Sequence, residues 1–157
     1  MNVFIFRFLG TLAIIAVVGL PSSADANAPA GQYVVPGGAS GNGTVYDTKS
    51  KLTWQQTVSL TRYAWSDAKT YCAGRGASLE GTGWRLPTIK ELVSIMDHSQ
   101  TFGPTIDGSA FPGTPTAWFY WSSSLTQSPS VAWDANFNQG YTYSDGVSNT
   151  GYVRCVR

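Results

Sequence analysis

The clearest local structural signal in the chain is the stretch Gly83-Trp84-Arg85-Leu86-Pro87-Thr88-Ile89-Lys90-Glu91-Leu92. Thr88 and Glu91 have the spacing of a capping box, in which each side chain accepts a hydrogen bond from the backbone N–H of the other residue. Pro87 stands directly before the box, as expected where a helix begins. Apolar residues follow at helical spacing, namely Ile89, Leu92, Val93 and Met96. The stretch therefore predicts a helix over about residues 89–96.

The three residues Trp84, Arg85 and Leu86 lead into this helix and carry no reactive group. We expect Trp84 and Leu86 to fill the core, and Arg85 to find a buried acidic or carbonyl partner. A second helix is predicted before them, because Trp65, Ala68 and Cys72 fall at i, i+3 and i+7. This spacing puts the cysteine on the buried face of that helix, and Gly74 is suited to end it.

Residues typical of strands recur in short runs, with polar or glycine-containing turns at 47–51, 138–140 and 144–146. A long irregular loop is predicted over 97–117, which holds three prolines. The expected strands are 44–46, 52–54, 118–123, 131–137, 140–143 and 152–156. This order predicts an α+β domain, with both helices on one side of an antiparallel sheet.

The first 26 residues have the layout of a secretory signal peptide. Arg7 precedes an apolar run from Phe8 to Leu20, and Ala24-Asp25-Ala26 supplies a small-x-small cleavage site. The run is too short for a comfortable membrane span. We therefore expect export to the periplasm, the cell surface or the medium, with no membrane span after cleavage. Residues 27–43 are predicted to be a flexible leader, followed by one domain over residues 44–157.

The charge and the cysteines narrow the possible functions further. Ten Lys and Arg against nine Asp and Glu give a net charge of +1. No basic stripe is available to neutralise phosphates, which argues against nucleic-acid binding.

Cys72 and Cys155 are the two cysteines, and in an exported chain they are expected to form one disulfide, from the first helix to the last strand. Neither has a partner at metal-ligand spacing and the chain has a single histidine, His98, so no metal or cofactor is expected.

Five segments of the chain together carry a resemblance to a known family. They are Gly43-Thr44-Val45-Tyr46-Asp47 with Leu52-Thr53-Trp54-Gln55, then Ala68-Lys69-Thr70-Tyr71-Cys72, then Gly83 to Leu92, then Tyr120-Trp121-Ser122-Ser123-Ser124, and Tyr152-Val153-Arg154-Cys155-Val156-Arg157. In this order they resemble the DUF1566 family, also called the Lcl C-terminal domain after a Legionella collagen-like adhesin, over about residues 43–157. The resemblance implies a C-type-lectin-like fold, in which a cysteine of the first helix commonly pairs with one in the final strand.

The C-terminal third combines aromatic residues with short amides and carboxylates, a mixture that suits sugars or an adaptable protein contact. If Trp133, Ala135 and Phe137 point inward, alternation along the strand turns the polar residues between them outward. The other interpretation is that the aromatics are core and the polar residues form solvated turns. The candidate ligand-binding residues are Asp134, Asn136, Asn138, Tyr141, Tyr143, Asp145 and Asn149.

We expect no enzyme activity. Both cysteines are assigned to the disulfide, and no spacing indicates the paired carboxylates that a glycosidase requires.

Two hypotheses of different class remain. In the first, the protein is an exported, non-catalytic module that binds a carbohydrate or glycan-bearing surface, as an adhesin does. In the second, it is a structural or assembly protein of the cell envelope, and the same residues contact a partner protein.

Overall fold

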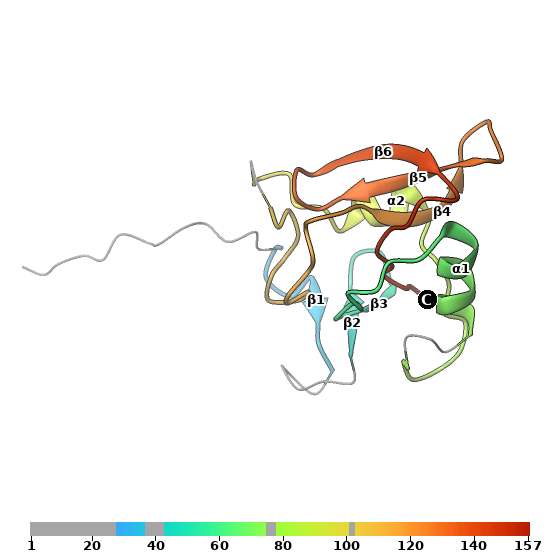
Figure 1. The fold of residues 1–157 in the computed structure, drawn as a ribbon. Helices are drawn as coiled ribbons and strands as arrows, with labels where there is room; N and C mark the ends of the chain where they lie inside the picture. Colours follow the sequence, from blue (N-terminus) through green and yellow to red (C-terminus); the bar gives the residue numbers. More distant parts are fainter. Residues whose placement is uncertain (1–27, 37–42, 75–77, 101–102) are drawn as a thin grey trace, which may run out of the picture.

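The computed structural model describes residues 28–36, 43–74, 78–100 and 103–157. The predicted signal peptide over residues 1–26 lies outside them, as do residue 27 and residues 37–42 of the predicted leader. The described chain is an α+β domain with two antiparallel three-stranded sheets instead of one (Figure 1). The first sheet contains β1 (Tyr33–Val34), β2 (Thr44–Asp47) and β3 (Thr53–Gln55). The second contains β4 (Tyr120–Leu125), β5 (Val131–Asn136) and β6 (Tyr141–Gly146).

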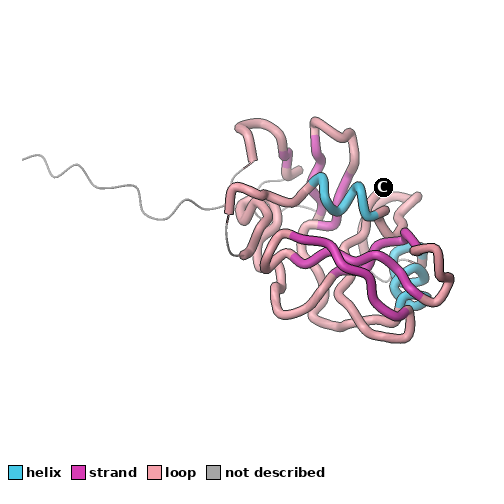
Figure 2. The backbone as a smooth tube through the Cα atoms, turned by 90° about the horizontal axis from the view of Figure 1, so that it is seen from above, coloured by secondary structure: helices cyan, strands magenta, loops and turns pink. Residues whose placement is uncertain are grey.

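Both predicted helices are present. The first, α1 (Trp65–Ala73), is followed by Gly74 as its C-cap. The second, α2 (Ile89–Ser94), begins with the predicted capping box, but it ends two residues earlier than expected, with Ile95 as its C-cap. Long loops make up much of the backbone between these elements (Figure 2), in agreement with the loop expected over 97–117.

The second sheet has buried apolar residues on both of its faces. Tyr120 packs with Leu92 and Ile95 of the α2 region in one cluster. Its neighbour Trp121 packs with Cys72 of α1 in the other cluster. Because successive residues of a strand point to opposite faces, the two helices contact opposite sides of this sheet. The expectation that both helices lie on one side was therefore wrong.

The predicted strand over 152–156 is also absent. This segment makes isolated bridges instead: Tyr152 pairs with Tyr120 of β4, while Val156 pairs with Trp54 of β3 and with Arg85. The segment passes from one sheet to the other, so its residues meet different neighbours and form no continuous ladder (Figure 1). The disulfide between Cys72 and Cys155 is present as predicted, and it joins α1 to this C-terminal segment.

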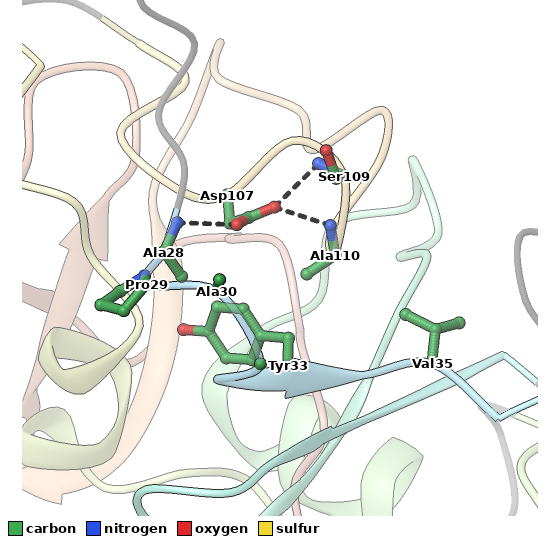
Figure 3. A pocket seen from close by; sticks show the side chains of 9 residues that line it. Ala28, Pro29, Ala30, Tyr33, Val35, Asp107, Ser109 and Ala110 are labelled. Atoms are coloured by element: carbon green, nitrogen blue, oxygen red, sulfur yellow. Dashed lines mark hydrogen bonds between the residues drawn. The ribbon is translucent and has the colours of Figure 1, made fainter.

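Part of the predicted flexible leader is ordered and belongs to the fold. β1 pairs with β2, and the Tyr33 ring lies edge-on against Phe111 at a centroid distance of 5.1 Å. The backbone N–H of Ala28 donates to the Asp107 carboxylate at 2.8 Å. Figure 3 shows this carboxylate among the residues that line a cavity, where it also accepts from the N–H groups of Ser109 and Ala110. The volume of the cavity is about 230 Å³. Three backbone donors therefore occupy Asp107, which anchors the leader to the domain.

Candidate ligand-binding site

The strand register brings five of the seven candidate residues onto one face of the second sheet. Asn136 lies opposite Tyr141, Asp134 opposite Tyr143, and Ala132 opposite Asp145. Residues directly opposite each other in an antiparallel pair project from the same face. We call the set formed by Asp134, Asn136, Tyr141, Tyr143 and Asp145 the β5–β6 face.

Two tyrosines form the exposed part of the β5–β6 face. Tyr143 is 59% exposed and Tyr141 is half-buried. Their rings meet edge to face, with centroids 4.6 Å apart and planes at 88°. Both stand on β6, which is at the edge of its sheet. The Tyr141 hydroxyl donates to the side-chain oxygen of Gln139, a residue that the sequence interpretation did not include in the site.

Asp134 is the buried part of the β5–β6 face. It is 1% exposed, and its Oδ2 atom has no hydrogen-bond partner among the described residues. Trp121 lies opposite it on β4 and Tyr143 on β6. Burial, and secondarily the nearby Asp145 carboxylate, raise the pKa of Asp134 to about 7. The environment therefore disfavours its charged form.

The expected orientation of β5 was wrong at two positions. Trp133 was predicted to point inward and Asp134 outward, but Trp133 is 38% exposed and Asp134 is buried. Ala132 and Ala135 are both fully buried, although they project from opposite faces. Core clusters cover both faces of the strand, so burial along β5 does not alternate with a period of two.

Asp145 and Asn149 together hold the loop that follows β6. The Asp145 carboxylate accepts from the Gly146 N–H at 2.8 Å and from the Asn149 side-chain amide. Residues 144–146, expected to be a turn, are the last three residues of β6. At the other end of the face, the Asn136 side-chain oxygen accepts from the N–H of exposed Asn138 at 2.8 Å, which holds the turn between β5 and β6. Asn138 and Asn149 thus lie in the loops at the two ends of the face.

A second cavity lies beside α1, where two basic residues contribute to its lining. Its volume is about 370 Å³, and Lys69, Leu86 and Arg85 are among the residues around it. The Lys69 ammonium group lies 4.5 Å from the centre of the Trp65 ring. Both terminal nitrogens of Arg85 donate to Glu91, at 2.8 and 2.7 Å. Arg85 therefore has the expected acidic partner, although the pair is partly exposed and not buried.

Two kinds of feature are absent from the residues that the structure describes. These residues contain no group of three or more His, Cys, Asp or Glu side chains that could hold a metal ion. They also contain no helix that is long and apolar enough to cross a membrane. The β5–β6 face combines two aromatic rings with amide and carboxylate oxygens, and this set of groups is suited to accept hydrogen bonds and to stack.

The two sheets, two helices and one disulfide define a small α+β domain with a polar and aromatic site at a sheet edge. The model of the Lcl C-terminal domain family matches residues 43–157, and the chain therefore belongs to this family. This confirms the resemblance found in the sequence. A search of curated proteins found no match. Residues 28–36 precede the matched region, yet they pack against it through β1 and Asp107.

Proposed function

We propose that the protein is an exported, non-catalytic module that recognises a carbohydrate or a glycan-bearing surface through the β5–β6 face. The observation that carries the proposal is the pair of tyrosine rings, Tyr143 exposed and Tyr141 half-buried, beside hydrogen-bonding oxygens on one sheet face. Aromatic rings provide apolar area at a small cost in conformational entropy, and they pack against the apolar faces of sugar rings. Amide and carboxylate oxygens accept hydrogen bonds from sugar hydroxyl groups.

The rest of the fold supports such a role. The disulfide and the C-terminal segment tie the second sheet to α1 and to the first sheet, which gives the face a rigid support. Binding residues are commonly found at the edges and loops of such scaffolds. The disulfide is also consistent with an oxidising compartment, and therefore with export. Membership of a family named after an adhesin favours surface recognition. The C-type-lectin-like fold that the resemblance implies is part of this proposal.

A role in envelope assembly is the second candidate, and the edge position of β6 favours it. β6 has six residues and lies at the end of the strand order β4-β5-β6. An edge strand presents N–H and C=O groups to which a strand of a partner protein can add. In that case the same face would contact a protein, and side-chain changes on β6 would matter less than its backbone.

The test compares two variants of the mature protein on a glycan array and in a pull-down from an envelope fraction. Replacing Tyr141 and Tyr143 together by alanine should abolish glycan binding, because both stacking surfaces are lost. Trp133→Ala is the matched control, since it removes an exposed aromatic from the opposite face of the same sheet. Asp145 is left unchanged, because it holds the loop after β6. Normal glycan binding by the double variant would reject the face, and capture of an envelope protein without any glycan would favour the second candidate.

A further inference from the structure

We propose that the β5–β6 face selects a glycan that carries a primary ammonium group, such as an oligomer of glucosamine, and that Asp134 and Asp145 bind this group. The inference rests on the proposed function, and it names the chemical class of the ligand.

The two carboxylates lie close enough to share one ligand group. Asp134 is opposite Tyr143 and Asp145 is two residues further along β6, so the two aspartates are diagonal neighbours on one sheet face. Such neighbours are about 7–8 Å apart along the sheet, and their side chains can converge above it. An ammonium group has three N–H donors and no acceptor, so it can donate to both carboxylates at once. No third acidic group is needed for this contact.

The unpartnered oxygen of Asp134 indicates that a donor is missing from the site. Asp134 Oδ2 is buried and accepts no hydrogen bond from the described residues, whereas buried polar atoms in folded proteins nearly always have a partner. The side chain opposite it is that of Tyr143, which is largely exposed and packs edge to face against Tyr141. A rotation of this ring would open a path from solvent to Asp134, and the ring would then flank the bound group.

The charge around the face favours a cation over an anion. The sequence has no Lys, Arg or His between His98 and Arg154, but this segment contains Asp107, Asp134 and Asp145. Burial and the Asp145 carboxylate raise the pKa of Asp134, and no basic group is among the causes of this pKa shift. A positive ligand would relieve the repulsion between the two carboxylates, and the tyrosine rings would add a cation–π attraction. A sulfated or carboxylated glycan would meet repulsion here.

The closing experiment uses two glycans that differ in one group. Isothermal titration of the mature protein with a β-linked glucosamine hexamer should show binding at least about tenfold tighter than with the matching N-acetylglucosamine hexamer. Binding of the glucosamine hexamer should weaken as salt is raised, because charges at a partly exposed site are screened. Equal or tighter binding of the acetylated hexamer would overturn the inference, and so would a complete lack of binding to the glucosamine hexamer.

Variants locate the contact. Asp134→Asn and Asp145→Asn should each weaken binding of the glucosamine hexamer by at least about tenfold, with cooperative melting retained. Asp67→Asn is the matched control, because Asp67 is an exposed carboxylate on α1, and it should leave the affinity unchanged. If one aspartate variant does not fold, the other decides, and an unchanged affinity in a folded variant would overturn the inference.

Three further arms separate the alternatives. A trilysine peptide that binds as tightly as the glucosamine hexamer would show that the face takes any ammonium group, which would overturn the selection of a glycan. Binding that is lost with a chelator and restored by calcium would overturn direct contact between ammonium and carboxylate. If uncharged or sulfated glycans bind the face and the glucosamine hexamer does not, the inference fails and the proposed function stands. If no glycan binds at all, the proposed function fails as well.

Discussion

Arg154 is fully buried and makes no ion pair among the described residues. Its guanidinium group instead donates to the carbonyl oxygens of Gln55 and Gln56, at 2.7 and 2.6 Å, and to the Thr114 hydroxyl at 2.8 Å. It also lies 4.7 Å from the centre of the Phe111 ring. Burial lowers the pKa of this group, but an arginine remains charged in proteins. Arg154 thereby joins the C-terminal segment to the end of β3.

Arg154→Lys should destabilise the protein by about 2–4 kcal/mol, because one ammonium group cannot reproduce the planar fork of donors. The measurement is the free energy of unfolding in urea. Arg62→Lys is the control, since Arg62 is exposed and its guanidinium group lies over the Trp118 ring. A loss of stability no larger than that of Arg62→Lys would mean that the hydrogen bonds of Arg154 contribute little.

Asp134 should make stability depend on pH. Its pKa is about 7 in the folded protein against 3.8 as a free side chain. Between these values the folded state holds a proton that the unfolded state has released, so stability falls as pH rises from about 4 to about 7. Asp145 is the titratable group that adds to this shift, and no basic group offsets it.

Asp134→Asn removes this ionisation. The variant should match the wild type near pH 4 and should be more stable by about 1–2 kcal/mol near pH 8, because the wild type then buries a charge without a partner. Thermal melts at both pH values measure the difference. A variant that is equally destabilised at both values would contradict the prediction, because it would indicate lost packing and no effect of charge.

At the scale of elements, the start of α2 is fixed by a small network. Thr88 Oγ1 accepts from the Glu91 N–H at 3.3 Å, and the Glu91 carboxylate accepts from the Thr88 N–H at 2.7 Å. The same carboxylate binds Arg85, and this contact, by hydrogen bonding, is the main cause that lowers the pKa of Glu91. The Ser124 hydroxyl accepts from the Ile89 N–H at 3.1 Å and connects the helix to β4.

Thr88→Ala should destabilise the protein by about 1 kcal/mol, through loss of the N-cap acceptor. The midpoint of urea denaturation is the measurement. Thr70→Ala is the control, since Thr70 is exposed in α1 and its hydroxyl donates only to the Ser66 carbonyl of the same helix. The free energy of unfolding of this control should change by less than about 0.5 kcal/mol. An unchanged midpoint for Thr88→Ala would show that Arg85, Glu91 and Ser124 fix the helix start without the cap.

At the scale of the whole molecule, the C-terminal segment contacts both sheets and α1. Its backbone bonds to β4 at Tyr152 and to β3 at Cys155 and Arg157. The disulfide ties the same segment to α1 and spans 83 positions of sequence. In the chain-entropy model, a disulfide that closes a loop of that length stabilises the folded state by roughly 4–5 kcal/mol.

Replacing Cys72 and Cys155 together by alanine should therefore cost about 2–5 kcal/mol of stability and lower the Tm by several degrees or more. Calorimetry of the oxidised wild type and the double variant measures the change. The reduced wild type is the control and should melt close to the double variant. If the double variant has the same Tm as the oxidised wild type, packing of the C-terminal segment stabilises the fold without the crosslink.

The sequence by itself determined the features that depend on few residues. The capping box of α2 and the burial of Cys72 on α1 arise within two helical turns, and two cysteines allow a single intramolecular pairing. The hairpin of β2 and β3 follows from two strand-forming runs joined by a short polar turn. For the candidate site, the sequence indicated which residues lie side by side, because a short loop makes β5 and β6 pair with each other.

Only the tertiary structure decided which side chains of β5 and which arginine side chains are buried. β5 lies between two core clusters, so Asp134 is buried and Trp133 exposed against the expected alternation. Arg154 is fully buried, while Arg85, in the segment with the strongest local signal, is partly exposed. These outcomes depend on segments up to about a hundred positions apart, as for the bond from Arg154 to Gln55. The physical reason is that burial is set by neighbours in space, and local spacing carries no information about which distant segments will be those neighbours.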